Sequence, residues 1–91
     1  MSEFDHPFMI NPDIVVQQVE NETLLLHPTS GAIFGLDGVS SRVWELMQSS
    51  RNLSEVKEHM LEDFEVDEDQ LEHDLLAFLA QLKSIAAIES P

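Results

Sequence analysis

The sequence predicts an α+β domain in which a three-stranded antiparallel β-meander is followed by three helices. Short runs of aliphatic and β-branched residues, separated by turn residues, fill positions 14–36, and after Gly38 the hydrophobic period changes from two to about 3.6. The chain has 91 residues and no cysteine, so it has room for one domain, which packing alone must hold together. We expect a flexible N-terminal arm over residues 1–11, the domain over 12–88 and a C-terminal tail over 89–91.

Three short strands are predicted at residues 14–19, 23–27 and 32–36. A polar turn separates the first two, and the turn residues at 28–31 separate the second from the third. Because consecutive strands joined by short turns pair with their neighbours, the middle strand is paired on both sides and the first and third strands are the edges.

Two helices follow, over about residues 38–49 and from Leu53 onward. Asn52 and Glu55 have the spacing of a capping box, in which the cap side chain accepts an amide hydrogen bond and the glutamate reaches back. The apolar positions recur at helical spacing and predict the faces that point to the core. These are Val39, Val43, Trp44, Leu46 and Met47 in the first helix, and Leu53, Val56, Met60, Leu61 and Phe64 in the second.

The third helix is predicted to begin after an Asp67 cap and to run to about Ile85. One stripe along it contains Leu71, Leu75, Phe78, Leu82 and Ile85, and a second contains Glu72, Leu76, Leu79 and Lys83. The second stripe has two interpretations, which the sequence leaves open. It is either part of a wide core-facing stripe or one wall of a groove.

Charge excludes several classes of partner. The chain carries 18 acidic and 4 basic residues, a formal net charge of −14, so a polyanion is repelled and neither nucleic acid nor an anionic membrane is an expected partner. No apolar stretch approaches the length of a membrane span, and the first residues lack the pattern of a secretion signal. We therefore expect an acidic cytoplasmic protein.

No catalytic or metal-binding pattern is visible. Asp69 and His73 lie four residues apart, but no second pair at ligand spacing accompanies them. Residues 63–68 imitate the start of a calcium loop, yet Glu68 stands where the turn needs glycine. Neither Ser40 nor Ser41 has a neighbouring base to activate it. We expect no catalytic residue, no metal and no cofactor, and hence no enzyme.

A sheet combined with three helices has the content of a winged-helix-like domain, a class that often binds DNA. Here the third helix, which would be the recognition helix, begins with Asp67, Glu68 and Asp69 and would repel phosphates. The binding surface of such a domain must then serve another ligand. A winged-helix transcriptional or signalling module remains the alternative function.

Several segments together resemble a known family. They are residues 25–37, which include the run Phe34, Gly35 and Leu36 after a Pro-x-x-Gly turn, residues 43–47 around Trp44, and residues 52–56. Their order and spacing resemble the PqqD-like family, also called RiPP recognition elements, over about residues 12–88. Members of this family are small chaperones that bind the leader of a ribosomally synthesised precursor peptide.

The resemblance implies a non-catalytic peptide chaperone that presents the leader to a separate modifying or leader-cleaving enzyme. In the family the leader adds a strand along the third strand, in a groove against the third helix. Members often have asparagine where Asp37 stands, and a glycine near the end of the last helix, where this chain has Ala86 and Ala87. The implied peptide-binding residues are Ile33, Phe34, Gly35 and Leu36 on the strand and Glu68, Leu71, Glu72, Leu75, Leu76 and Leu79 on the helix.

Elementary physics leads to the same strand. An edge strand exposes unpaired amides and carbonyls, which are a liability unless they are covered or used. Phe34 and Leu36 share a face that packs inward, while Gly35 on the other face leaves room for a second backbone. The competing interpretation is that the third strand simply ends the sheet and is covered by the N-terminal arm.

Overall fold

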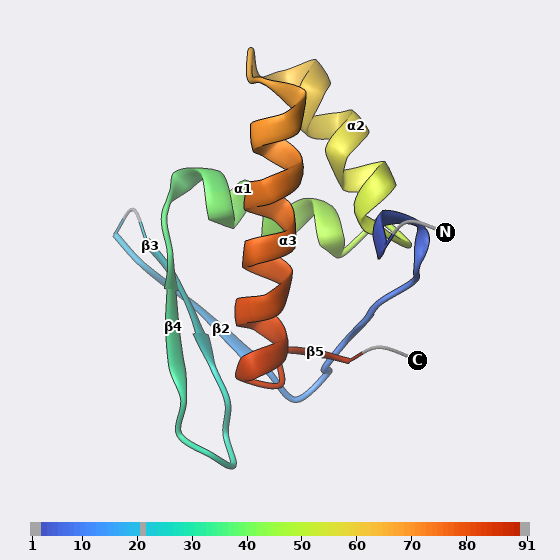
Figure 1. The fold of residues 1–91 in the computed structure, drawn as a ribbon. Coiled ribbons are helices and arrows are strands. Elements are labelled where there is room, and N and C mark those ends of the chain that lie inside the picture. Colours follow the sequence, from blue (N-terminus) through green and yellow to red (C-terminus); the bar gives the residue numbers. More distant parts are fainter. Residues whose placement is uncertain (1–2, 21, 90–91) are drawn as a thin grey trace.

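A computed structural model describes residues 3–20 and 22–89 of the chain (Figure 1). A short 3-10 helix and strand β1 precede a three-stranded sheet, three helices and a final strand β5. The fold class predicted from the sequence is therefore confirmed. In chain order the elements are η1 (Glu3–Asp5), β1 (Met9–Ile10), β2 (Val15–Val19), β3 (Glu22–Leu26), β4 (Ile33–Leu36), α1 (Gly38–Met47), α2 (Leu53–Asp63), α3 (Glu68–Ser84) and β5 (Ile88–Glu89).

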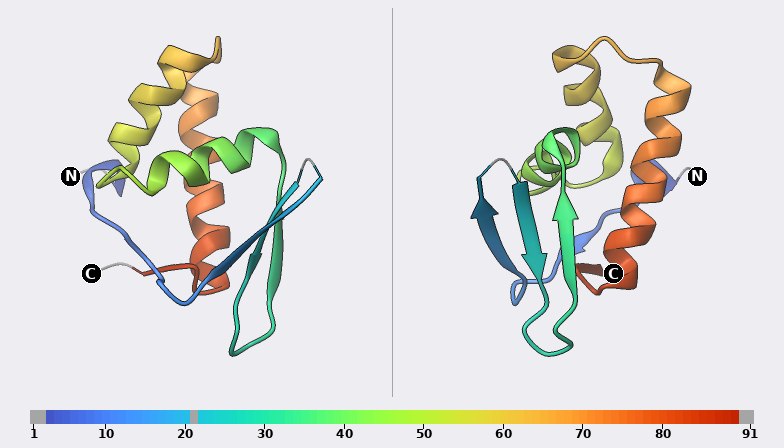
Figure 2. Two further views of the ribbon diagram at one scale, coloured as in Figure 1. Left: turned by 180° about the vertical axis from the view of Figure 1, so that it is seen from behind. Right: turned by 90° about the vertical axis from the view of Figure 1, so that its left-hand side faces the viewer.

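The three-stranded sheet has the order β2-β3-β4 with antiparallel pairing throughout. Val16 pairs with Leu25, and Leu25 pairs in turn with Phe34, so these three residues form one row across the sheet. The predicted order and the predicted edges, β2 and β4, are both confirmed. In Figure 2 the strand β4 is the one nearest to α3, and β2 lies farthest from it.

The helices pack on one face of this sheet. Leu25 and Leu36 are buried on that face, while Ile33 on the opposite face of the sheet is 65% exposed. Residues from all three helices complete the core, because each helix turns its apolar stripe toward the sheet or toward a neighbouring helix. The largest fully buried side chains are Leu25, Leu36, Met47, Leu53, Val56, Met60, Leu75 and Leu82.

Each helix begins at a side-chain cap. The amides of Ser40 and Glu55 donate to Asp37 and Asn52 at 2.8 and 3.1 Å, and the amide of Gln70 donates to Asp67 at 3.4 Å in the same way. The caps predicted at 52 and 67 are thus confirmed. The reach-back half of the box differs, because Glu55 accepts from the amide of Arg51 at 2.6 Å rather than from that of the cap.

Several apolar residues predicted to face the core are open instead. Val39 in the first turn of α1 is 55% exposed, and Leu61 and Phe64 at the end of α2 are 36% and 37% exposed. The first helix also ends at Met47 rather than at residue 49. These three residues lie where α1 starts and α2 ends, at the margin of the core. Val39 and Phe64, together with Val66, border a pocket described below.

The N-terminal segment that we expected to be a loose arm is packed against the domain. Phe4 is buried in the core, and β1 pairs antiparallel with β5. Asp5 accepts a hydrogen bond from the Ser54 hydroxyl of α2 at 2.9 Å, and the amide of Asn11 donates to the carbonyl of Ala87 at 2.9 Å. The arm therefore joins the start of α2 to the end of the chain.

The last helix ends at an alanine in the left-handed region. Ala86 has a φ of 57°, its amide donates to Lys83, and the amide of Ala87 donates to Leu82. This is a Schellman ending, whose central position glycine favours. The family resemblance led us to expect a glycine near this helix end, and here Ala86 takes the left-handed position.

Candidate functional site

The candidate site is the free edge of β4 where it runs alongside α3 (Figures 1 and 2). The ring of Phe34 contacts the ring of Phe78 on α3, with centroids 6.2 Å apart, and this contact joins the strand to the helix. The N-terminal arm does not cover this edge, because β1 pairs with β5 and not with β4. The competing interpretation, an edge covered by the arm, is therefore wrong for the described residues.

The hydrogen-bond pattern shows which peptide groups of β4 point outward. Next to the turn, the amide of His27 donates to the carbonyl of Ala32 at 2.9 Å, and pairs along an antiparallel ladder then alternate between bonded and non-bonded. Phe34 and Leu36 are thus bonded to β3, whereas the backbone groups of Ile33 and Gly35 point to the open side. Two N–H donors and two C=O acceptors are available there.

The turn before β4 fixes this register. Gly31 has a φ of 79°, and its amide donates to the carbonyl of His27 at 2.9 Å, so Gly31 and Ala32 together face His27 as in a G1 bulge. The His27 ring nitrogen Nδ1 accepts from the amides of Thr29 and Ser30 at 3.3 and 3.2 Å. Hydrogen bonds among its own residues close the turn, and the pairing of β4 with β3 begins at Ile33.

Gly35 is not required by the fold of the strand. A Cβ built there would meet only Leu24 Cδ2, at 3.6 Å, which is an ordinary contact. The bare backbone at this position therefore leaves space rather than relieving strain. That space is on the outer side of the sheet, next to the donors and acceptors that point away from β3.

A hollow of about 440 Å³ lies beside the end of β4. Its walls come from the strand itself, from Glu22 on β3, from Asp37 and Ser40 where α1 starts, and from Gln81 on α3. Two carboxylates and no basic residue line it. An extended chain laid along β4 would pass through this hollow and meet negative charge at its end.

An apolar pocket of about 170 Å³ lies farther along α3, between the start of α1 and the corner that joins α2 to α3. Ser40 lines both this pocket and the hollow beside β4, so the two are neighbours on the same side of α3. Gln70 and Asp74 stand among the lining residues and are hydrogen-bonded to each other at 2.9 Å. The apolar lining is Val39, Val43, Met60, Phe64, Val66, Leu71, Leu75 and Phe78.

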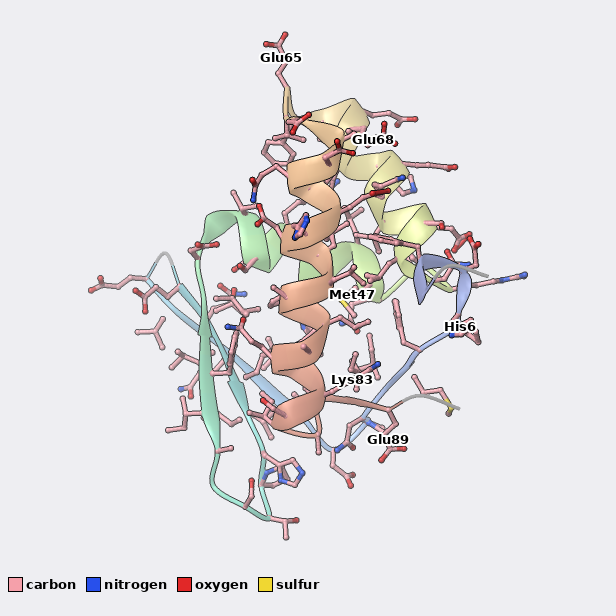
Figure 3. The ribbon with its side chains drawn as sticks, in the orientation of Figure 1. His6, Met47, Glu65, Glu68, Lys83 and Glu89 are labelled. Carbon is pink, nitrogen blue, oxygen red and sulfur yellow. The ribbon has the colours of Figure 1, made fainter. Side chains whose placement is uncertain are left out.

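The structure divides the predicted helix residues between two flanks of α3. Leu71 and Leu75 line the apolar pocket, which is linked to the hollow beside β4 through Ser40. Glu68 and Glu72 instead bind Lys57 of α2, at 3.1 and 3.0 Å. Figure 3 shows Glu68 and Lys83 on the side of α3 that faces α2 and β5, away from β4.

Leu76 and Leu79 share the stripe of Glu72 and follow it onto the same flank. Leu79 is buried and Leu76 packs against the core. The Lys57 ammonium that binds Glu72 also lies 5.6 Å from the centre of the Phe4 ring, so the arm lies on this flank as well. Of the two interpretations of the second stripe, the wide core-facing stripe is therefore correct.

Sequence reasoning missed several α3 residues that line the apolar pocket or the hollow beside β4. Gln70, Asp74 and Gln81 line the pocket or the hollow, and Phe78, which we assigned to the core, also touches Phe34. Their spacing of four, four and three residues was the available signal. This signal is weak, because three of the four residues are polar or partly exposed and any helix has a row of residues at this spacing.

Among the described residues, two titratable groups have shifted pKa values, because hydrogen bonds favour their charged forms. The backbone amide of Ser40, which donates to Asp37, lowers the pKa of that carboxyl, and the Ser40 side chain contributes in the same direction. Hydrogen bonds to Glu72 and then to Glu68 raise the pKa of Lys57. Lys57 thereby joins α2 to the flank of α3 that does not face β4.

The arrangement is suited to binding an extended chain. Within residues 3–20 and 22–89, no group of three or more histidine, aspartate or glutamate side chains is placed to hold a metal ion. None of the described helices is long and apolar enough to cross a membrane. A ligand at this edge would meet free main-chain donors and acceptors, an aromatic floor and an apolar pocket with an acidic rim.

Comparison with known proteins gives one family and two structures. The family model described as "Coenzyme PQQ synthesis protein D (PqqD)" matches residues 22–88. The solved structure of "TbiB1 in Complex with the TbiA(beta) Leader Peptide" shares 32% identity over 89% of this chain and 94% of that chain, with a TM-score of 0.80. No curated protein sequence gives a significant match.

A second structure, "Lasso peptide synthetase B1 complexed with the leader peptide", also has a TM-score of 0.80, at 22% identity. It covers 91% of this chain and 98% of that chain. At this identity the likeness concerns the fold alone, and it supports the arrangement of sheet and helices described above.

Proposed function

The chain belongs to the PqqD family, and we propose that it is a non-catalytic chaperone that binds the leader of a ribosomally synthesised precursor peptide. The leader adds a strand to β4, with part of its side chains in the groove beside α3. The chaperone then presents the bound precursor to a separate modifying or leader-cleaving enzyme. We expect it to act in the cytoplasm, where such precursors are synthesised.

The observation that carries this proposal is the free edge of β4. Ile33 and Gly35 direct their backbone groups to the open side, and no described segment of the chain pairs with them. Strand addition uses such groups for affinity and neighbouring pockets for selectivity. The related TbiB1, at 32% identity, is bound to a leader peptide, which supports the same kind of ligand here.

The surroundings of β4 define the leader that fits. Alternate residues of an added strand point toward α3, where the rings of Phe34 and Phe78 form an apolar floor. A residue beyond the paired segment reaches the apolar pocket near Asp74. The hollow contains Glu22 and Asp37 and no cation. A lysine or arginine of the leader, next to the leader's apolar residues, therefore strengthens binding and speeds association at low salt.

The number of available groups sets the affinity. Four main-chain hydrogen bonds at about 0.5–1.5 kcal/mol each and two apolar anchors at about 1.5–3 kcal/mol each oppose an association cost of at least about 4 kcal/mol. The most favourable balance is about 8 kcal/mol, which corresponds to a Kd of about 1 μM. We therefore expect micromolar binding, tight enough to select a precursor and weak enough to release it.

Titration followed by NMR tests the proposal. The ¹⁵N-labelled protein is titrated with the TbiA(beta) leader peptide and with leaders of short precursors encoded beside the gene of this chain. We expect chemical-shift changes in 31–37 and in the face of α3 that contains Gln70, Asp74, Phe78 and Gln81. Changes confined to the flank of Glu68 and Glu72, or none with any leader, would contradict strand addition at β4.

A DNA-binding assay separates the proposal from the winged-helix alternative. We expect no electrophoretic shift of duplex DNA at physiological salt, because residues 67–74 at the start of α3 contain five carboxylates and no lysine or arginine. A shift at that salt concentration would support a transcriptional module and would count against the chaperone.

A further inference from the structure

The other edge of the sheet, β2, is also open. All five residues of β2 are exposed, and the side chains of Val15, Val16 and Val19 are 49%, 47% and 44% exposed. Proteins commonly protect an edge strand with lysine, proline, a bulge or an inward charge. The sequence of β2 contains no lysine, no proline and no charged residue, and its pairing with β3 is continuous, without a bulge.

The direction of the free groups on β2 follows from the same ladder. Since Thr23 and Leu25 are bonded to β4, the alternate residues of β3 are bonded to β2. Val16 and Gln18 therefore point their N–H and C=O groups to the open side. This gives β2 the same set of main-chain donors and acceptors as Ile33 and Gly35 give β4.

A hollow of about 330 Å³ lies beside this edge, between β2 and α1. Val16 and Gln18 form one side, and Trp44 and Glu45 of α1 form part of the other. The inward side chains of a strand added to β2 would enter this space. Trp44 is the single tryptophan of the chain, and it lines neither of the two spaces beside α3.

Charge indicates what kind of strand fits. The chain contains no lysine or arginine before Arg42, so the whole sheet lacks both. Asp13 and Glu20 flank the uncharged strand at its two ends, and Glu45 stands across the hollow. We propose that β2 is a second strand-addition site, which takes an extended segment of a partner protein with an uncharged centre and lysine or arginine at its ends.

A second copy of the chain is the less favoured occupant. Antiparallel self-pairing centred on Gln17 would place Val15 opposite Val19, which is apolar and compatible. It would also bring the carboxylates of Asp13 and Glu20 from the two copies to the same two ends of the shared pair, where like charges repel. Each copy has a net charge of −14, which adds a long-range repulsion.

The inference goes beyond the proposed function and does not rest on it. If β4 holds the leader, β2 on the far side of the sheet is free to hold another protein at the same time. Failure at one edge leaves the other edge untouched, so the two proposals can be tested on one sample.

The test uses a synthetic heptapeptide in which valine and threonine alternate between two terminal lysines, and a control with glutamate in place of both lysines. Binding is followed by Trp44 fluorescence and by NMR in the Gly35→Pro variant, in which the β4 edge is blocked. We expect shifts in 15–19 and a change in tryptophan emission. The glutamate control should bind at least about fivefold more weakly, and raising the salt should weaken the lysine peptide.

Val16→Pro is the decisive variant, because it removes an outward N–H without removing a bond to β3. It should weaken binding of the lysine peptide at least about tenfold while the helical circular dichroism is unchanged. Binding that survives Val16→Pro, or a peptide that shifts only residues beside α3, would overturn the inference. So would concentration-dependent dimerisation through β2 that strengthens with salt, because the second copy would then be the occupant.

Discussion

The two edges of the sheet expose the same backbone chemistry in different surroundings. Both β2 and β4 direct the N–H and C=O groups of two residues outward. Beside β4 stands α3, with an aromatic floor and an apolar pocket, whereas beside β2 there is a hollow that α1 borders with Trp44 and polar side chains. Because the main chain offers the same groups at both edges, we expect the neighbouring helix to decide which peptide each edge binds tightly.

Removal of the arm's anchor tests whether either edge is covered by the chain itself. Phe4→Ala empties a buried position and should lower the free energy of unfolding by about 3 kcal/mol, measured by urea denaturation. Leader affinity should not change, because the arm pairs with β5 and lies on the far flank of α3. A large gain in leader affinity would mean that the arm competes for β4.

Proline substitution at each edge separates the roles of β4 and β2 most directly. Gly35→Pro should weaken leader binding by at least about thirtyfold, or about 2 kcal/mol, because the ring removes an outward N–H and blocks approach. Val16→Pro should leave leader affinity unchanged and serves as the matched control. Isothermal titration calorimetry measures both. Equal losses in the two variants would point to a general loosening of the sheet.

Charge reversal on α3 tests how much this helix contributes to the preference for a basic leader. Asp74→Lys places a cation at the apolar pocket and should lower the affinity for a basic leader by about three- to tenfold at low salt. Glu58→Lys on α2 makes the same change in net charge at an exposed position outside both spaces. If both variants lower the affinity for the leader equally, the net charge of the protein, rather than the pocket, determines the preference for a basic leader.

The smallest expected effect concerns Asp37, the carboxylate at the end of β4, which caps α1, whereas neither Asp13 nor Glu20 beside β2 caps a helix. The pKa of Asp37 is lowered by the amide of Ser40, so its contribution to stability is complete above its ordinary pKa of about 4 and is lost as the pH falls through the lowered value. Asp37→Asn keeps a capping oxygen without this titration.

The variant and the original chain should therefore differ by a few tenths of a kcal/mol near neutral pH and converge in acid. Urea denaturation at several pH values measures the difference. Because asparagine caps a helix about as well as aspartate, a difference that persists unchanged in acid would show that the charge of Asp37 does not contribute.

The sheet, its edges and the helix starts could be predicted from the sequence because the signals are local. The turn at 28–31, the cap at Asn52 and the change of period after Gly38 each act within a few residues. The same reasoning placed Phe34 and Leu36 inward and left Gly35 open, as the structure has them. It also identified β4 as the candidate edge.

The helix wall of the site could not be obtained in this way. Glu68 and Glu72 look as suitable as Gln70 and Asp74 in the sequence, since all four lie on the first turns of one acidic helix. Only the position of Lys57 on α2 shows which flank is occupied. The docked arm likewise depends on Phe4 meeting α2, a contact with no local signature.

The strands, the helices and the edges of the sheet follow from the sequence, because backbone preference and capping are properties of neighbouring residues. The tertiary structure alone decided which flank of α3 faces the free edge, that the arm lies elsewhere, and that β2 is open as well. These depend on how helices roll and pack against one another, and packing joins residues that are distant in the chain.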